Sequence, residues 1–89
     1  MNPNAEGRIK EVRMPHVEIK CYPGRTEEVK RACAERVAAD VAETLGCPAT
    51  AVSVAIKEIP QEEWKDKVYD GQIMADKDAL YVAPGYTCD

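Results

Sequence analysis

The chain has 89 residues and a formal net charge of -4, with acidic and basic residues interleaved along it. A chain of this length forms one small domain, and such a domain buries only about 60% of the surface of its unfolded chain. The sequence has no basic stripe for a phosphate backbone and no apolar run of about 18 residues, so we expect neither a nucleic-acid partner nor a membrane span. No secretory leader pattern opens the chain, and we expect a cytoplasmic protein.

The four cysteines are widely spaced, at positions 21, 33, 47 and 88, and His16 is the only histidine. There is no C-x-x-C pair, so we predict no metal site. We expect free thiols, with Cys21 on a strand and Cys33 on the apolar side of a helix, where small thiols are usually buried. Because a domain of this size without a metal or a disulfide needs other support, we also expect a homo-oligomer.

The N-terminal segment lacks the alternation that follows it. Residues 1–8 mix Asn, Pro and Gly without periodicity, and Met14 is out of phase with the alternating apolar positions after it. We therefore predict a break or bulge near Pro15. Residues 1–14 form an N-terminal extension, and residues 15–89 form the domain.

A strand and a long helix come next. Residues 15–22 alternate between apolar and polar side chains, which predicts a β-strand, and "YPGR" supplies a turn. Thr26 is a good N-cap, and two glutamates follow it in the first helical turn, so we predict a helix from there to about Leu45, ended by Gly46. The apolar face of this helix is predicted to consist of Val29, Cys33, Val37, Val41 and Leu45, widened by alanines.

The second strand is predicted in "AVSVAIKEI", residues 51–59. A strand, a helix and a strand form a β-α-β unit with a parallel strand pair and a right-handed crossover, so the fold class is α/β (α+β). The helix covers one face of this pair, and we expect the other face, with small or apolar groups such as Ala55, to pack on another subunit. After Pro60 we predict a helical turn over residues 64–68, a break at Gly71 and a short apolar end.

Three residues are candidates for chemistry. Pro15 heads the first strand, Arg25 lies in the turn that ends it, and Trp64 is the only tryptophan. At about 3.3 Å per residue, Pro15 and Arg25 of one chain lie roughly 25 Å apart, so they share a site only if different subunits contribute them. Each also has a structural interpretation: a strand-initiating proline, a solvated turn arginine and a core or interface aromatic.

From Pro15 to Tyr86 the chain resembles the 4-oxalocrotonate tautomerase family. The residues that carry the resemblance are "PHVEIKCYPGRTEE" (15–28), "TLGCPATAVSVAIKEI" (44–59), the tryptophan at 64 and "DALYVAPGY" (78–86). They are most similar to the longer, phenylpyruvate-type branch of the family. The resemblance implies a β-α-β fold completed by subunit association, as a dimer or alternatively a hexamer. It also implies a cofactor-free keto-enol tautomerase that acts on a small carboxylic acid, a 2-keto acid or its enol.

The resemblance assigns roles by position. Pro15 matches the proline whose nitrogen is the general base, and Arg25 matches an arginine from a neighbouring subunit that holds a carboxylate or polarises a carbonyl. Trp64 matches an aromatic residue that makes the pocket apolar, and Ser53 stands where 4-oxalocrotonate tautomerase has a second arginine. This difference argues against a dicarboxylated substrate. The predicted substrate-binding residues are therefore Trp64, Ser53 and His16.

The base requires a free Pro15 amine. A free α-amine has a pKa of about 7.7–8.0, which a neighbouring cation and an apolar wall lower further, whereas an internal proline nitrogen is an amide without useful basicity. Either the working protein begins after Met14 and is a tautomerase, or residues 1–14 are retained. In the second case the protein is non-catalytic or uses another base, such as His16 or Lys57. A small regulatory or interaction module is a third interpretation.

Overall fold

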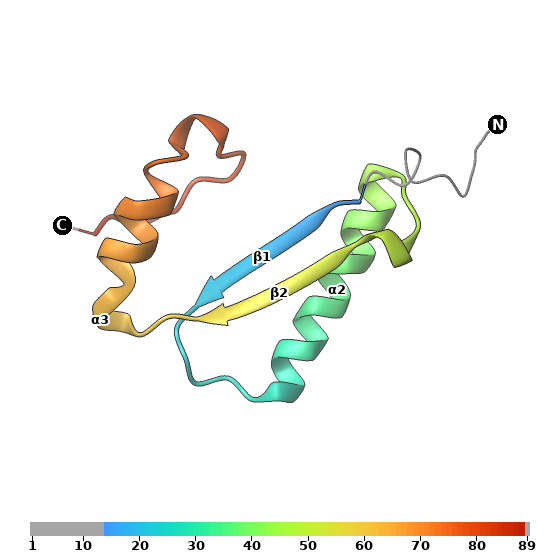
Figure 1. The fold of residues 1–89 in the computed structure, drawn as a ribbon, viewed down its shortest axis with the longest axis horizontal. Helices are drawn as coiled ribbons and strands as arrows, with labels where there is room; N and C mark the ends of the chain where they lie inside the picture. The colour runs from blue at the N-terminus through green and yellow to red at the C-terminus, as the bar shows by residue number, and fades with distance from the viewer. Residues whose placement is uncertain (1–13, 89) are drawn as a thin grey trace. The chain divides into compact units, whose positions relative to one another are not determined.

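The computed structural model describes residues 14–88, so the predicted N-terminal extension lies outside the described residues apart from Met14. In chain order, the main elements are β1 (His16–Cys21), α2 (Glu27–Leu45), β2 (Ser53–Glu58), α3 (Gln61–Trp64) and the π-helix η2 (Lys65–Ile73), as Figure 1 shows. Short 3-10 turns cover Ala49–Ala51 and Lys77–Ala79. The described chain divides into two compact units: residues 14–19 with 24–57, and residues 20–23 with 58–88.

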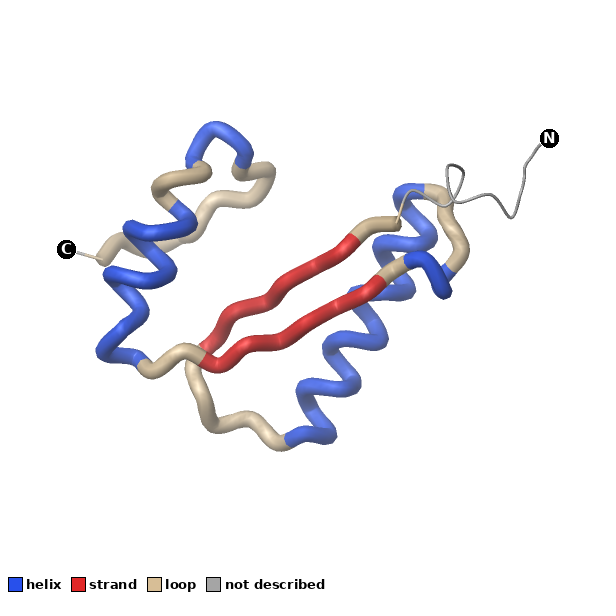
Figure 2. The backbone as a smooth tube through the Cα atoms, in the orientation of Figure 1, coloured by secondary structure: helices blue, strands red, loops and turns tan. Residues whose placement is uncertain are grey.

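The two strands are parallel, as predicted. The amide of Ser53 donates to the carbonyl of Pro15 at 3.2 Å, and the amide of Ile59 donates to the carbonyl of Cys21 at 2.8 Å. Both hydrogen bonds join residues 38 positions apart, and a constant separation means that the strands run in the same direction. Among residues 14–88 these two strands form the sheet, and α2 connects them (Figure 2). The predicted β-α-β unit is confirmed.

The ends of α2 follow the predicted capping residues. The side-chain oxygen of Thr26 accepts from the amide of Val29 at 3.2 Å, which satisfies one of the free N–H groups of the first turn. Gly46 has a φ of 72°, a left-handed conformation that costs glycine little, and its amide donates to the carbonyl of Ala42. The predicted helix to Leu45 is therefore confirmed at both ends.

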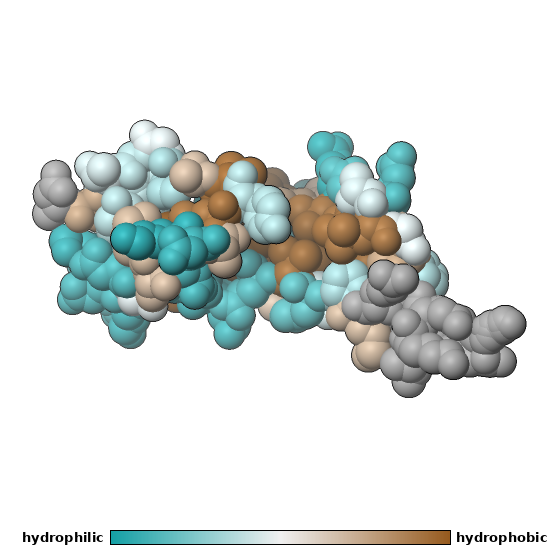
Figure 3. Space-filling model, turned by 90° about the horizontal axis from the view of Figure 1, so that it is seen from above, coloured by the Kyte–Doolittle hydropathy of each residue, from teal (hydrophilic) through white to brown (hydrophobic). Residues whose placement is uncertain are grey.

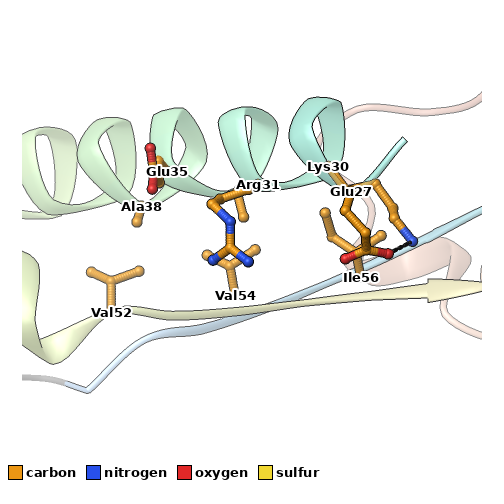
Figure 4. Close-up of a pocket in the computed structure, with 9 residues that line it drawn as sticks. Glu27, Lys30, Arg31, Glu35, Ala38, Val52, Val54 and Ile56 are labelled. Atoms are coloured by element: carbon orange, nitrogen blue, oxygen red, sulfur yellow. Dashed lines mark ion pairs between the residues drawn. The ribbon is translucent and has the colours of Figure 1, made fainter. Parts of the chain in front are cut away.

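The face that α2 presents to β2 differs from the predicted apolar stripe. Val54 and Ile56 of β2 point towards the helix, where they meet the side of α2 that carries Ala38 (Figure 4). Val29 and Leu45 of the predicted stripe are 52% and 61% exposed and Cys33 is also exposed, so the prediction was wrong for these three positions. Residues spaced by four advance about 40° more than a full turn at each step, and a long run of them therefore winds off the packed face.

The other face of the strand pair is more polar than predicted. His16 and Ser53 share a hydrogen bond there, and Lys57 forms an ion pair with Glu18 at 3.5 Å. Ala55 contributes a small side chain, as expected, but Ser53 and Lys57, its neighbours on the same face of β2, are polar and charged. Any surface that covers this face has to accommodate these polar pairs.

The second unit contains a longer helical segment than predicted. The predicted turn over residues 64–68 belongs to α3 and η2, which continue through Gly71 to Ile73. The predicted break at Gly71 was wrong because η2 is a π-helix, as the hydrogen bond from the amide of Met74 to the carbonyl of Tyr69 illustrates at 2.8 Å. A Cβ atom at Gly71 would lie 2.7 Å from the carbonyl oxygen of Asp66. Glycine is required by this close approach and does not end the helix.

Few apolar side chains are buried in the described chain. Val68 and Tyr69 of η2 are its buried hydrophobic residues, with 3% and 8% of their surface exposed. The predicted short apolar end is exposed at Tyr81 and Val82. Apolar residues are accordingly visible at the surface in Figure 3. No helix among residues 14–88 is both long and apolar enough to cross a membrane.

Candidate functional site

Pro15, His16 and Ser53 lie together where the two strands begin. The Pro15 carbonyl accepts from the Ser53 amide at 3.2 Å, and the Ser53 hydroxyl is 2.6 Å from His16 Nδ1. The direction of the second hydrogen bond depends on the imidazole tautomer. His16 and Ser53 are exposed, so a ligand has access to both. The structure therefore brings together three of the five residues predicted from the sequence.

The residue before this cluster has an unusual backbone. Met14 has a φ of 40°, in the left-handed region that non-glycine residues rarely adopt, and its side chain is 60% exposed. A following proline restricts the backbone of its predecessor further, and such conformations cost on the order of 1–3 kcal/mol. The predicted irregularity near Pro15 is confirmed. The peptide bond that keeps the Pro15 nitrogen as an amide therefore lies in a strained and accessible junction.

Arg25 and the Pro15 cluster lie at opposite ends of β1. Arg25 is exposed in the loop between the end of β1 and the start of α2, after Gly24 with its φ of 130°. Pro15 comes directly before His16, the first residue of β1, whose course Figure 1 shows. One chain therefore does not bring Arg25 to Pro15, as the strand geometry predicted.

Trp64 belongs to the second unit, where it lies in a group of aromatic side chains. Its ring and that of Tyr22 are 5.2 Å apart and perpendicular, and its Nε1 donates to the hydroxyl of Tyr86 at 3.4 Å. Tyr86 in turn lies against Tyr69, with ring centres 5.8 Å apart. The three tyrosines were not predicted as functional residues. Only the final "PGY" of the resembling tail indicated Tyr86.

A groove of about 390 Å³ lies between α2 and β2 (Figure 4). Valine and isoleucine side chains of β2 form its floor, and charged side chains of α2 form its rim. Lys30 hydrogen-bonds Glu27 at 2.9 Å and so lowers the pKa of that carboxyl group. The groove contains none of the five predicted site residues.

Lys65 has a raised pKa because its ammonium group hydrogen-bonds the carboxylate of Asp70. Among residues 14–88 no group of three or more histidine, cysteine, aspartate or glutamate side chains is placed to hold a metal ion. The four cysteines are free thiols, and Cys21 is half-buried.

The chain is similar to proteins of one family. A family model described as "Tautomerase enzyme" matches residues 15–66. A "Probable tautomerase" of Xylella fastidiosa is 37% identical over 73 residues, which cover 82% of this chain and 89% of that protein. "Tautomerase PptA" of Pectobacterium atrosepticum is 41% identical over 75 residues, which cover 83% of this chain and 99% of that protein.

A solved structure has the same fold. It is TomN, described as a 4-oxalocrotonate tautomerase homologue in the tomaymycin biosynthetic pathway. The TM-score is 0.55 and the sequence identity is 31%, and the match covers 76% of this chain and all of that one.

Proposed function

Because this chain belongs to the tautomerase family, we propose that it is a cofactor-free keto-enol tautomerase whose base is the nitrogen of Pro15. The proposed substrate is a small 2-keto acid or its enol. The proposal requires that residues 1–14 are absent from the working protein, so that the nitrogen is a secondary amine.

The observation that carries this proposal is where the family match begins. The family model aligns from Pro15 onwards, and Pro15 is the residue that leads into β1 beside His16 and Ser53. A base at that point has hydrogen-bonding groups next to it that can hold the oxygen atoms of a substrate. The strained and exposed Met14 junction further supports a chain that works without the residues before Pro15.

The chemistry needs one base and one stabilising cation. A free α-amine has a pKa of about 7.7–8.0, so near neutral pH a useful fraction is unprotonated. The amine takes the hydroxyl proton of the enol, and the resulting ammonium gives a proton to the carbon of the double bond, which forms the keto acid and restores the free amine. The guanidinium of Arg25 stabilises the negative charge that develops on oxygen, and its planar fork suits a carboxylate.

A shared site of this kind requires at least two chains. Arg25 and Pro15 are at opposite ends of β1 in one chain, so the arginine of each site is proposed to come from another subunit. The sparse burial of apolar side chains in a single chain also favours a homo-oligomer. We propose a dimer, with a hexamer as the alternative assembly.

Activity of the chain that begins at Pro15 tests the proposed function. We expect this protein to convert the enol of phenylpyruvate to the keto form faster than buffer does, and the full 89-residue chain, whose Pro15 nitrogen is an amide, to lack the acceleration. The mass of the intact protein from the native organism tests the required start, since a working chain is expected to begin at Pro15. Retained residues 1–14 with full activity would instead favour a different base, with His16 or Lys57 as the candidates.

A further inference from the structure

We propose that Tyr86 is a positioning residue that holds the indole of Trp64 in one orientation. The inference rests on the proposed function in one respect, namely that Trp64 forms the apolar wall of the substrate site. Tyr86 does not touch the substrate in this account. It acts through the tryptophan.

Two different contacts constrain the indole. The perpendicular contact with Tyr22, at 5.2 Å between ring centres, favours one plane for the Trp64 ring because the edge of one ring meets the face of the other. The hydrogen bond to Tyr86 then favours one of the two ways in which the indole can lie in that plane. Nε1 is the only polar atom of the indole, and it can only donate. Rotation of the ring by half a turn would therefore lose this bond.

Tyr86 is itself anchored to a buried residue. Its ring lies against Tyr69, which is only 8% exposed and belongs to η2. The contact therefore joins the end of the described chain to the helical segment that follows Trp64. A tail residue without such an anchor would have no fixed position from which to accept a hydrogen bond.

The arrangement is open to solvent, unlike a structural core. Tyr22 is 42% exposed and Tyr86 is 46% exposed, so both rings leave much of their surface accessible. The hydrogen bond is long at 3.4 Å and stabilises the fold only weakly. Its greater consequence is the orientation of the half-buried indole, which is the property that a substrate wall requires.

Tryptophan fluorescence of the full chain tests the contact directly, because Trp64 is the only tryptophan. Tyr86→Phe keeps the ring and removes the hydroxyl. We expect this variant to show faster local motion in the decay of fluorescence anisotropy and an acrylamide quenching constant raised about twofold, in keeping with the loss of one weak hydrogen bond. Tyr81→Phe is the matched control. It removes a hydroxyl from the same tail at a fully exposed position and is expected to change neither value.

Two results would contradict the claim that the Tyr86 hydroxyl orients the indole of Trp64. One is Tyr86→Phe behaving like Tyr81→Phe. The other needs no variant, and is rapid, unrestricted motion of the indole in the wild-type chain. Circular dichroism of each variant checks that the fold is retained.

Kinetics of the active form of the chain separate this inference from the proposed function. We expect Tyr86→Phe to raise KM for phenylpyruvate about threefold and to change kcat less than twofold, since the base is untouched. An unchanged KM, or an equal fall in kcat and kcat/KM, contradicts the positioning role. If no form of the wild-type chain accelerates the reaction, the proposed function fails instead, whatever the fluorescence shows.

Discussion

Replacing Gly71 by alanine is the sharpest test of the π-helix. In an ordinary helix interior this change stabilises a protein by roughly 0.5–1 kcal/mol, because glycine loses more backbone freedom on folding. In η2 the added Cβ would lie 2.7 Å from the carbonyl oxygen of Asp66. That oxygen belongs to the backbone, so the contact is relieved only if the helix itself moves.

The expected sign is therefore reversed. Overpacking of this kind costs about 1–3 kcal/mol, which exceeds the usual gain from alanine. We expect a net loss of about 1–2 kcal/mol and a Tm lower by roughly 5–10 °C in a domain of this size. The movement of the helix backbone also disturbs Gln72, which accepts a hydrogen bond from Lys20 at 2.6 Å.

Thermal and urea unfolding at one fixed protein concentration measure the effect, since the stability of an oligomer depends on concentration. Gly85→Ala is the matched control because a Cβ there meets nothing within 4 Å, and Gly85 is not among the glycines with a positive φ. We expect the control to be neutral or stabilising by up to about 1 kcal/mol. If Gly71→Ala is as stable as the control, the π-helical explanation of this glycine is wrong.

Three further predictions concern the strand start, the subunit interface and the first turn of α2. Ser53→Ala is expected to lower kcat/KM of the active form about fivefold, the value of one hydrogen bond, with Ser53→Thr closer to wild type. Arg25→Gln is expected to lower kcat/KM on the order of 100-fold. Mixed refolding of Arg25→Gln chains that begin at Pro15 with full 89-residue chains, whose Pro15 nitrogen is an amide, should restore activity if subunits share sites, and no restoration contradicts sharing. Because the pKa of Glu27 is lowered from 4.5, its pairing with Lys30 stabilises the fold above pH 4.5 and is lost as pH falls through the lower folded-state pKa. The small Tm difference from Glu27→Gln should therefore disappear in acid.

Local chemistry made much of the fold predictable. Thr26 and Gly46 marked the ends of α2, and the alternation of apolar residues marked both strands, because capping and pleating depend on neighbours in sequence. Because a long helix connects the two strands, the strands were predicted to be parallel.

The errors came from features that depend on distant or unusual contacts. Gly71 looks like a helix breaker in sequence, but its role depends on the wider turn of a π-helix and the approach of Asp66. Cys33 fits an every-four pattern, but whether it is covered depends on how far the helix has turned by that position. The contact between Trp64 and Tyr86 joins residues 22 positions apart, and no local periodicity indicates it.

The central claim is that the nitrogen of Pro15 is the base, and one kinetic comparison tests it most directly. The conversion of phenylpyruvate enol to the keto form is measured with the chain that begins at Pro15 and with the full 89-residue chain, at equal concentration and pH. We predict a rate well above buffer for the first and no acceleration for the second, because only the first has an amine at that position. Equal rates from both chains, or no rate from the chain that begins at Pro15, would contradict the account.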